Sequence, residues 1–180
     1  MKMMRFNLLI SLSLSIFLFG CVSSKDSSLF DRKLAAKARV ELSLGYLSLG
    51  DTAQAKLNLD RALSYAPNYY LVHGALAYFY QLQGDNEKAQ KSYQQAIKLD
   101  NQQGDLFNNY GAFLCSQRQF KLAYQQFQTA LSIATYYHQA DTYENIMLCA
   151  LSENNSPLYQ KYYYLLEKIA PERAKKYKKL

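Results

Sequence analysis

The chain has 180 residues, a formal net charge of +7, and 17 tyrosines beside only 7 glycines, 3 prolines and no tryptophan. This length is enough for one domain with a real core, and the composition fits stacked helices with aromatic residues between them. Without Lys2 and Arg5 the charge is +5, and four of these five charges fall between Leu165 and Leu180. The body is therefore nearly neutral, which argues against a broad nucleic-acid-binding surface.

Residues 1–20 have the pattern of a secretory signal peptide. Lys2 and Arg5 supply its positive start, and an apolar stretch broken only by one asparagine and serines runs from Phe6 to Phe19. A permanent transmembrane helix needs roughly 20 apolar residues, so this stretch is too short to be one.

The apolar stretch ends at Cys21 in the sequence Leu-Phe-Gly-Cys, which resembles the bacterial lipobox. The resemblance implies cleavage before Cys21 and an N-acyl diacylglycerol lipid on this residue. Several acyl chains on one residue give lasting anchorage. In the alternative, the protein is secreted and Cys21 has no such role.

No aspartate follows in residues 22–24. By resemblance to lipoproteins of Gram-negative bacteria, this directs the chain to the outer membrane, on its periplasmic face. Residues 21–31 are rich in serine and lack a helix-forming pattern, so they are predicted to be a flexible tether.

The middle of the chain repeats with a period of about 34 residues, which is the period of the tetratricopeptide repeat (TPR). Small residues recur as Ala55, Ala89 and Ala123 and again as Ala62, Ala96 and Ala130, with Leu59, Tyr93 and Phe127 between them. This period with two small positions is typical of a TPR array, which is built from helix pairs and serves as a surface for binding other proteins. The sequence therefore predicts an all-α TPR superhelix of about four helix-turn-helix repeats.

The TPR domain is predicted over residues 32–171. The predicted repeats are about residues 36–69, 70–103, 104–137 and 138–171, followed by a basic C-terminal tail at 172–180. The first helix is expected from near Arg32 to Leu49, and turns are expected at Gly50 and Gly84 because glycine readily adopts the left-handed conformation that ends a helix. The third turn has Arg118 in this position. The fourth repeat is degenerate, as terminal repeats of an array often are.

The basic tail has two interpretations. Six basic residues stand against two acidic ones between Leu165 and Leu180. Such a run could contact anionic lipid or the carboxylates of peptidoglycan. The interpretation favoured by the sequence is simpler: the run ends the last helix and keeps it soluble.

Besides Cys21 the chain has Cys115 and Cys149, which are separated by one repeat period. This spacing places them on the first helices of adjacent repeats, and in an oxidising compartment it predicts a disulfide. Aligning Pro171 with Pro67 shifts the fourth repeat by two residues, which could turn Cys149 away from the shared face. In that case both cysteines would be buried thiols.

The sequence contains no glycine-rich phosphate loop, no HExxH and no GxSxG. His73 stands where TPR helices usually have an aromatic residue, which favours a packing role. His73 and His138 lie far from the cysteines in the repeat frame, so no metal site is expected. We expect a protein that is not an enzyme and has no cofactor beyond the lipid on Cys21.

The first helices of a TPR superhelix line its concave face. The residues predicted to form a partner-binding groove there are Val40, Leu44, Leu47, Leu71, Tyr78 and Asn108. An apolar patch in such a groove indicates an amphipathic segment of a partner. Beyond the patch, Asn108 and Asn109 make the groove polar, and their amides could bind a peptide backbone. Alternatively, the tether or an N-terminal helix folds back and covers the patch.

Two segments, residues 108–115 and 143–151, resemble the third- and fourth-repeat helices of the PilF/PilW family of type IV pilus lipoproteins, cysteines included. Met147 and Arg118 stand where that family usually has glycine. With the lipobox and the array, the resemblance covers nearly the whole chain after residue 20. It implies a monomeric outer-membrane lipoprotein that acts as a pilotin in type IV pilus biogenesis and twitching motility. Such a protein binds secretin subunits in its groove and promotes their outer-membrane localisation and multimerisation.

A second hypothesis is a general periplasm-facing TPR scaffold for peptidoglycan enzymes or another envelope complex. A third, an accessory chaperone for cofactor assembly, has less support because lipidation is unexpected there. A pilus gene neighbourhood would favour the first hypothesis, and a murein hydrolase pulled down with the protein would favour the second.

Overall fold

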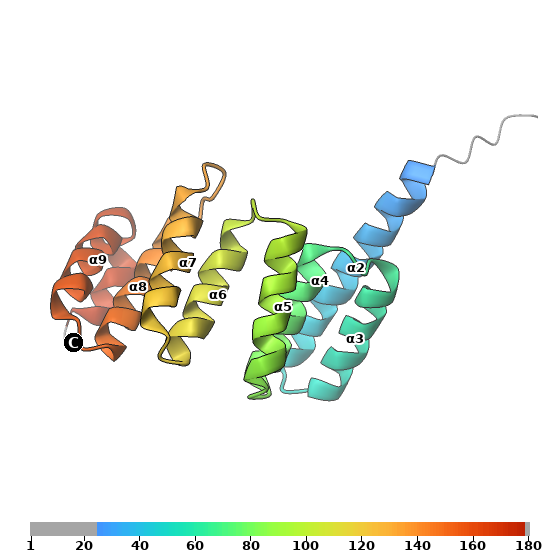
Figure 1. Ribbon diagram of the computed structural model, residues 1–180, viewed down its shortest axis with the longest axis horizontal. Coiled ribbons are helices and arrows are strands. Elements are labelled where there is room, and N and C mark those ends of the chain that lie inside the picture. The colour runs from blue at the N-terminus through green and yellow to red at the C-terminus, as the bar shows by residue number, and fades with distance from the viewer. Residues whose placement is uncertain (1–24, 179–180) are drawn as a thin grey trace, which may run out of the picture.

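The computed structural model describes residues 25–178. Its elements are α2 (Lys25–Ser48), α3 (Thr52–Tyr65), α4 (Tyr70–Leu82), α5 (Asn86–Leu99), α6 (Gly104–Ser116), α7 (Phe120–Ser132), α8 (Gln139–Ser152), α9 (Ser156–Ile169), α10 (Pro171–Ala174) and the 3-10 helix η1 (Lys175–Tyr177). Successive helices pack in the pairs α2–α3, α4–α5, α6–α7 and α8–α9, and the pairs are stacked from α2 at one end to α9 at the other (Figure 1). Over residues 25–178 the structure has the predicted all-α architecture of four helix-turn-helix repeats.

Each pair turns through one residue with a positive φ. These residues are Gly50 (78°), Gly84 (73°), Arg118 (59°) and Asn154 (63°). In every turn the N–H of the following residue donates to the carbonyl five residues back, as when Asp51 donates to Tyr46 over 2.9 Å and Asn155 to Ala150 over 2.8 Å. This bond is the helix-ending pattern that a left-handed residue permits, so the third turn keeps its geometry without glycine.

The small residues allow the two helices of a pair to cross closely. Ala55, Ala62, Ala89, Ala96, Ala123 and Ala130 are all fully buried. A Cβ atom on Gly111 would lie 2.6 Å from Cε1 of Phe127 and 3.1 Å from the backbone oxygen of Ala123. The α6–α7 crossing therefore has no room for another carbon atom.

The fourth pair is built differently. Its turn residue Asn154 lies one repeat period and two further residues after Arg118, whereas the earlier turn residues are one period apart. With this two-residue shift, Met147 occupies the position that Gly111 has in the third pair. Tyr159 and Leu166 occupy the positions of Ala123 and Ala130, and all three large side chains are buried. Large side chains thus fill the space between α8 and α9, whereas small side chains let the helices of the other pairs cross closely.

The expected tether is wrong in its second half. Helix α2 begins at Lys25, so residues 25–31 are helical, and the first helix starts earlier than the predicted Arg32. The predicted signal peptide 1–20 and the candidate lipidation residue Cys21 lie outside the described residues. Within residues 25–178, no helix combines the length and hydropathy required to cross a membrane.

The basic tail is also not a free extension over its described part. Ala174 of α10 is fully buried. Arg173 donates to Asp141 over 2.5 Å and also to Glu144, both on α8. Tyr177 donates to Glu144, and the Tyr159 hydroxyl donates to the carbonyl of Tyr177 over 3.1 Å. Residues 171–177 therefore fold onto α8 and α9 and close that end of the array.

Candidate functional site

A groove of about 510 Å³ runs along the first helices of the four pairs. It is lined by Val40 and Leu44 of α2, by Leu71, Gly74, Ala75, Tyr78 and Gln81 of α4, by Asp105, Leu106, Asn109 and Ala112 of α6, by Asn145 of α8, and by Tyr70, Tyr93 and Gln103. The repeat period explains this composition, because equivalent positions of successive first helices face the same side.

The apolar end of the groove has a buried floor and an exposed rim. Val40 is 1% exposed, whereas Leu44 and Tyr78 are 41% and 42% exposed. Gly74 leaves room on α4 for the side chain of Leu106 of α6, since a Cβ atom there would lie 2.8 Å from Cδ2 of Leu106. The exposed rim offers apolar surface to a partner, and the floor belongs to the core.

The other end of the groove carries amides. Asn145 donates through Nδ2 to Oδ1 of Asn108 over 3.0 Å, which links α8 to α6. Asn108 is 5% exposed, so its neighbour Asn109 presents the exposed amide of α6. This end can exchange hydrogen bonds with a peptide backbone or with polar side chains.

Asp105 is the charged side chain of the lining. Its Oδ1 lies 2.7 Å from Nδ1 of His138, and this hydrogen bond and the carboxylate charge raise the pKa of His138 above its usual value. The lining contains no lysine or arginine. The groove therefore has no basic clamp for an acidic peptide.

Tyr93 reaches the groove from the second helix of its pair. Its hydroxyl donates to Oε1 of Gln81 over 3.0 Å, and its ring stacks on Tyr110 with 5.3 Å between the ring centroids. Burial raises the pKa of Tyr93, so it remains a neutral hydrogen-bond donor. Its role is to fix Gln81 at the edge of the groove.

Four of the predicted groove residues, Val40, Leu44, Leu71 and Tyr78, line the groove. The prediction is wrong for Leu47, which packs against the core of the first two pairs, and for Asn108, which is buried and does not line the groove. The lining residues that sequence reasoning missed include Leu106 and Asn145.

A signal for Asn145 was present in the repeat spacing. Ala75 and Asn109 are one repeat period apart, and Asn145 follows after one period and two further residues. The shift that the sequence indicated for the fourth repeat would have placed Asn145 beside Asn109.

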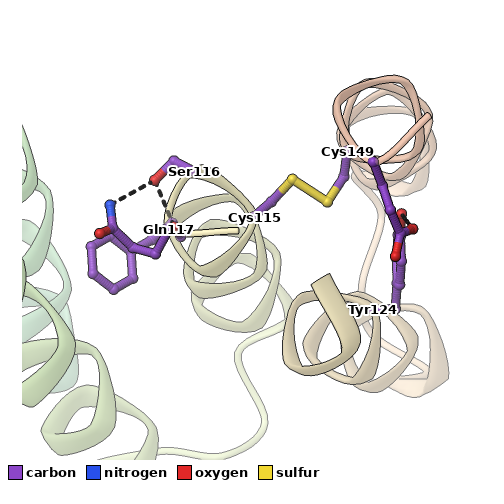
Figure 2. The surroundings of a disulfide bond; sticks show 7 residues. Cys115, Ser116, Gln117, Tyr124 and Cys149 are labelled. Carbon is purple, nitrogen blue, oxygen red and sulfur yellow. Dashed lines mark hydrogen bonds between the residues drawn. A yellow bond between two sulfur atoms is a disulfide. The ribbon is translucent and has the colours of Figure 1, made fainter. Parts of the chain in front are cut away.

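The structure joins Cys115 of α6 to Cys149 of α8 by a disulfide, with 5.8 Å between their Cα atoms (Figure 2). Neighbouring packed helices lie roughly 8–10 Å apart, so truly equivalent residues would be too far apart to bridge. The two-residue shift makes Cys149 the counterpart of Phe113 instead of Cys115. Because of this shift Cys149 faces α6. From the sequence alone the opposite effect was considered, that the shift turns Cys149 away from the shared face.

The two histidines hydrogen-bond to different parts of the array, His138 to Asp105 and His73 to the backbone. Nε2 of His73 lies 2.7 Å from the carbonyl oxygen of Pro67, which ties α4 to the preceding turn. Among residues 25–178, no cluster of histidine, cysteine, aspartate and glutamate side chains could hold a metal ion.

The tetratricopeptide repeat family matches residues 46–108. A relative in Haemophilus influenzae, an uncharacterised protein, is 51% identical over 164 residues, which cover 91% of this chain and 92% of the relative. The type IV pilus assembly protein PilF of Pseudomonas aeruginosa is 34% identical over 155 residues, which cover 84% of this chain and 61% of PilF.

Solved structures show the same relationship. The structure of Pseudomonas aeruginosa PilF superposes with a TM-score of 0.73 at 30% identity, covering 78% of this chain and 64% of that one. The structure of PilW, a widely conserved type IV pilus biogenesis factor, gives 0.70 at 26% identity, covering 76% and 62%. The chain thus spans somewhat less than two thirds of the length of these pilus proteins.

Proposed function

Because the chain belongs to the PilF/PilW-like tetratricopeptide-repeat proteins, we propose that it is a pilotin of type IV pilus biogenesis. In this role it binds subunits of the pilus secretin in its inner groove and promotes their localisation and multimerisation in the outer membrane. The observation that carries the proposal is the exposed apolar rim of that groove, at Leu44 and Tyr78.

A partner that covers the exposed apolar rim would stabilise the complex. Covering a large apolar side chain stabilises a complex by roughly 25 cal/mol for each Å² removed from water. Leu44 and Tyr78 together can therefore contribute a few kcal/mol before the cost of ordering the partner. The same contact would shield apolar surface of an unassembled secretin subunit and limit its aggregation.

The charges of the lining side chains also limit which segments can bind in the groove. Asp105 is the charged residue of the lining, and lysine and arginine are missing from it. An acidic segment would lose hydration there without gaining a countercharge. The groove therefore favours an apolar segment with neutral or basic flanks.

A lipid on Cys21 would anchor the protein in the membrane and direct it to the outer membrane. Only three residues separate Cys21 from the start of α2 at Lys25. Four chain steps span at most about 14 Å, so the helix would begin close to the membrane surface. The lipoprotein sorting route would then carry the bound subunit to the outer membrane together with the pilotin.

A deletion strain tests the proposal. Outer-membrane fractions are blotted for heat-resistant secretin multimers, with wild type, Cys21→Ala and empty vector as complementing copies. The proposal predicts that the multimer is lost or mislocalised and is restored by wild type but not by Cys21→Ala. An unchanged multimer in the deletion strain would reject the pilotin role and move the function to the envelope-scaffold alternative.

The same strain tests the groove. Leu44→Asp and Tyr78→Ala should abolish secretin binding while the circular dichroism of the purified variants stays helical, because both side chains lie on the exposed rim. Wild-type multimer levels with Leu44→Asp would show that the subunit binds elsewhere. Leu122→Asp on α7 is a matched control, since Leu122 is 46% exposed and does not line the groove.

A further inference from the structure

The face of α2 that points away from the array is apolar and uncovered. Leu34, Leu42 and Leu49 are 55%, 49% and 80% exposed on this face. A hollow of about 690 Å³ lies along it, lined by Ala38, Glu41, Leu42, Gly45, Tyr46, Ser48 and Leu49. In a stacked array the first helix of a pair packs against the preceding pair, but within residues 25–178 no pair precedes α2. We call Ala38, Leu42, Gly45 and Leu49 the outer seam.

Gly45 is the one glycine within residues 25–178 for which the packing of these residues gives no reason. The other glycines either adopt a positive φ at a turn or leave room for a large side chain: Gly50 and Gly84 do the first, and Gly74, Gly104 and Gly111 do the second, for Leu106, Tyr136 and Phe127. A Cβ atom on Gly45 would meet nothing within 4 Å. Glycine in an exposed helix is less stable than alanine. The other helical glycines therefore indicate that Gly45 receives a large side chain from a segment outside the described residues.

We infer that this segment is the outer seam of a second copy, and that two chains pair through antiparallel α2 helices about a two-fold axis. The residues of the outer seam follow one another at steps of four, three and four, which is the spacing of a coiled-coil seam. Small and large residues alternate along it. Antiparallel pairing brings Leu42 of one copy over Gly45 of the other, and Leu49 over Ala38, whereas parallel pairing sets leucine against leucine. This pairing departs from the monomer that the family resemblance implies.

The charges beside the outer seam fit the same arrangement. Lys37, Glu41 and Ser48 lie on one edge of α2, and Asp51 follows one turn after this edge ends. In an antiparallel pair like edges meet, so Lys37 lies across from Asp51 of the second copy. Glu41 lies across from Ser48. Within its own chain Lys37 reaches Glu41 only at 3.9 Å. Asp51 uses Oδ1 to accept the N–H of Gln54, which leaves Oδ2 for Lys37. Opposite charges thus meet at both ends of this edge.

Pairing places the grooves of both copies on one side of the dimer. Leu44 of the groove rim is one helical turn from both Glu41 and Ser48, so it lies on the same edge of α2. Because like edges meet, the two grooves open toward the same side. This consequence rests on the proposed function: the dimer holds two secretin subunits side by side and so promotes their multimerisation.

Cysteine cross-linking of the full-length chain tests the pairing and its register. The double variant Ala38→Cys/Leu49→Cys is oxidised in whole cells and resolved on a non-reducing gel. We expect a covalent dimer, because position 38 of one copy lies opposite position 49 of the other. Each single variant, and Leu122→Cys on α7, should stay monomeric, since like positions of the antiparallel seam are roughly 16 Å apart along the helix. Dimers of the single seam variants would overturn the antiparallel register. A monomeric double variant would overturn the pairing itself.

Gly45→Leu, added to the double cysteine variant, tests the contact at Gly45. The variant should fold, as circular dichroism can verify, because the space around Gly45 is open. We expect the cross-linked fraction to fall at least fivefold, since the new side chain occupies the place of Leu42 of the second copy, and Leu122→Asp should leave it unchanged. An unchanged fraction in Gly45→Leu would overturn the contact.

The secretin multimer separates this inference from the proposed function. We expect Gly45→Leu in the otherwise wild-type chain to lower the multimer level. A wild-type level would overturn the role of the dimer in multimerisation and leave the pilotin standing. Normal multimers in the deletion strain would overturn the proposed function, while the cross-link still reports on the pairing by itself.

Discussion

Gly111 lies where α6 crosses α7, and its missing side chain is a packing requirement. A Cβ atom would lie 2.6 Å from the ring of Phe127 and 3.1 Å from the carbonyl oxygen of Ala123. Gly45 of α2 is the contrast, because a Cβ atom there meets nothing within 4 Å. The repeat pattern predicted small residues where the helices of a pair cross, and Gly111 lies at such a crossing, whereas Gly45 has open surroundings.

These two glycines give a matched pair of substitutions. Gly111→Ala should lower the free energy of unfolding by roughly 1–3 kcal/mol, because the new methyl group overpacks the crossing. Gly45→Ala should raise it by roughly 0.5–1 kcal/mol, because alanine is the better helix former. Urea unfolding followed by circular dichroism measures both. A stability gain in Gly111→Ala would contradict the close packing of α6 on α7.

His138 provides a test of the electrostatics beside the groove. Its hydrogen bond to Asp105, helped by the charge of Asp141, raises its pKa above the usual value. The stabilisation from this pair is therefore present below about pH 6.5 and is lost as the pH rises through the raised pKa. An NMR titration should show the raised pKa, and Asp105→Asn should bring it down. An unchanged midpoint in Asp105→Asn would exclude the Asp105 contact as the cause.

At the scale of helices, the sequence predicted the pairs and their order but not the ends of the array. The repeat period located the turns at Gly50 and Gly84, since both the small residues and the turn residues recur. The serine-rich composition suggested a tether up to Asp31, yet α2 continues back to Lys25. The net charge of the tail predicted a soluble end to the last helix. It did not predict that Arg173 contacts Asp141 and Glu144 of α8, because charge alone does not identify a partner.

The disulfide between α6 and α8 closes a loop whose ends are 34 residues apart. For a loop of this length, the chain-entropy model gives a stabilisation of roughly 3–4 kcal/mol. The double variant Cys115→Ser/Cys149→Ser should therefore unfold at lower urea concentration by about that free energy. Intact mass after alkylation, with and without reductant, verifies the bridge in the parent protein. Two freely alkylated thiols without reductant would contradict it.

The C-terminal segment provides a second test at this scale. Arg173 contacts Asp141 and Glu144, and the Glu144 side chain is only 16% exposed. Lys175 pairs with Glu172 in the open, with their side chains 66% and 81% exposed. Arg173→Met should lower the free energy of unfolding by about 1–2 kcal/mol, whereas Lys175→Met should change it by less than about 0.5 kcal/mol. Equal effects in a thermal melt would show that the segment does not hold the end of the array.

At the scale of the whole molecule, four stacked pairs turn repeated residues into one continuous inner surface. The sequence predicted the apolar end of the groove, because positions that face inward recur with the repeat. It missed the burial of Asn108 and the packing of Leu47, because both depend on how neighbouring helices meet. The two-residue shift of the fourth pair decides which side chains of α8 join the surface.

The central claim is that this inner surface binds the pilus secretin subunit. Its most direct test is the dissociation constant of the purified subunit for the wild-type protein, Leu44→Asp and Leu122→Asp, measured by titration calorimetry. We predict binding by wild type and by Leu122→Asp, and a loss of at least tenfold in affinity in Leu44→Asp. Unchanged affinity in a folded Leu44→Asp variant would contradict the claim.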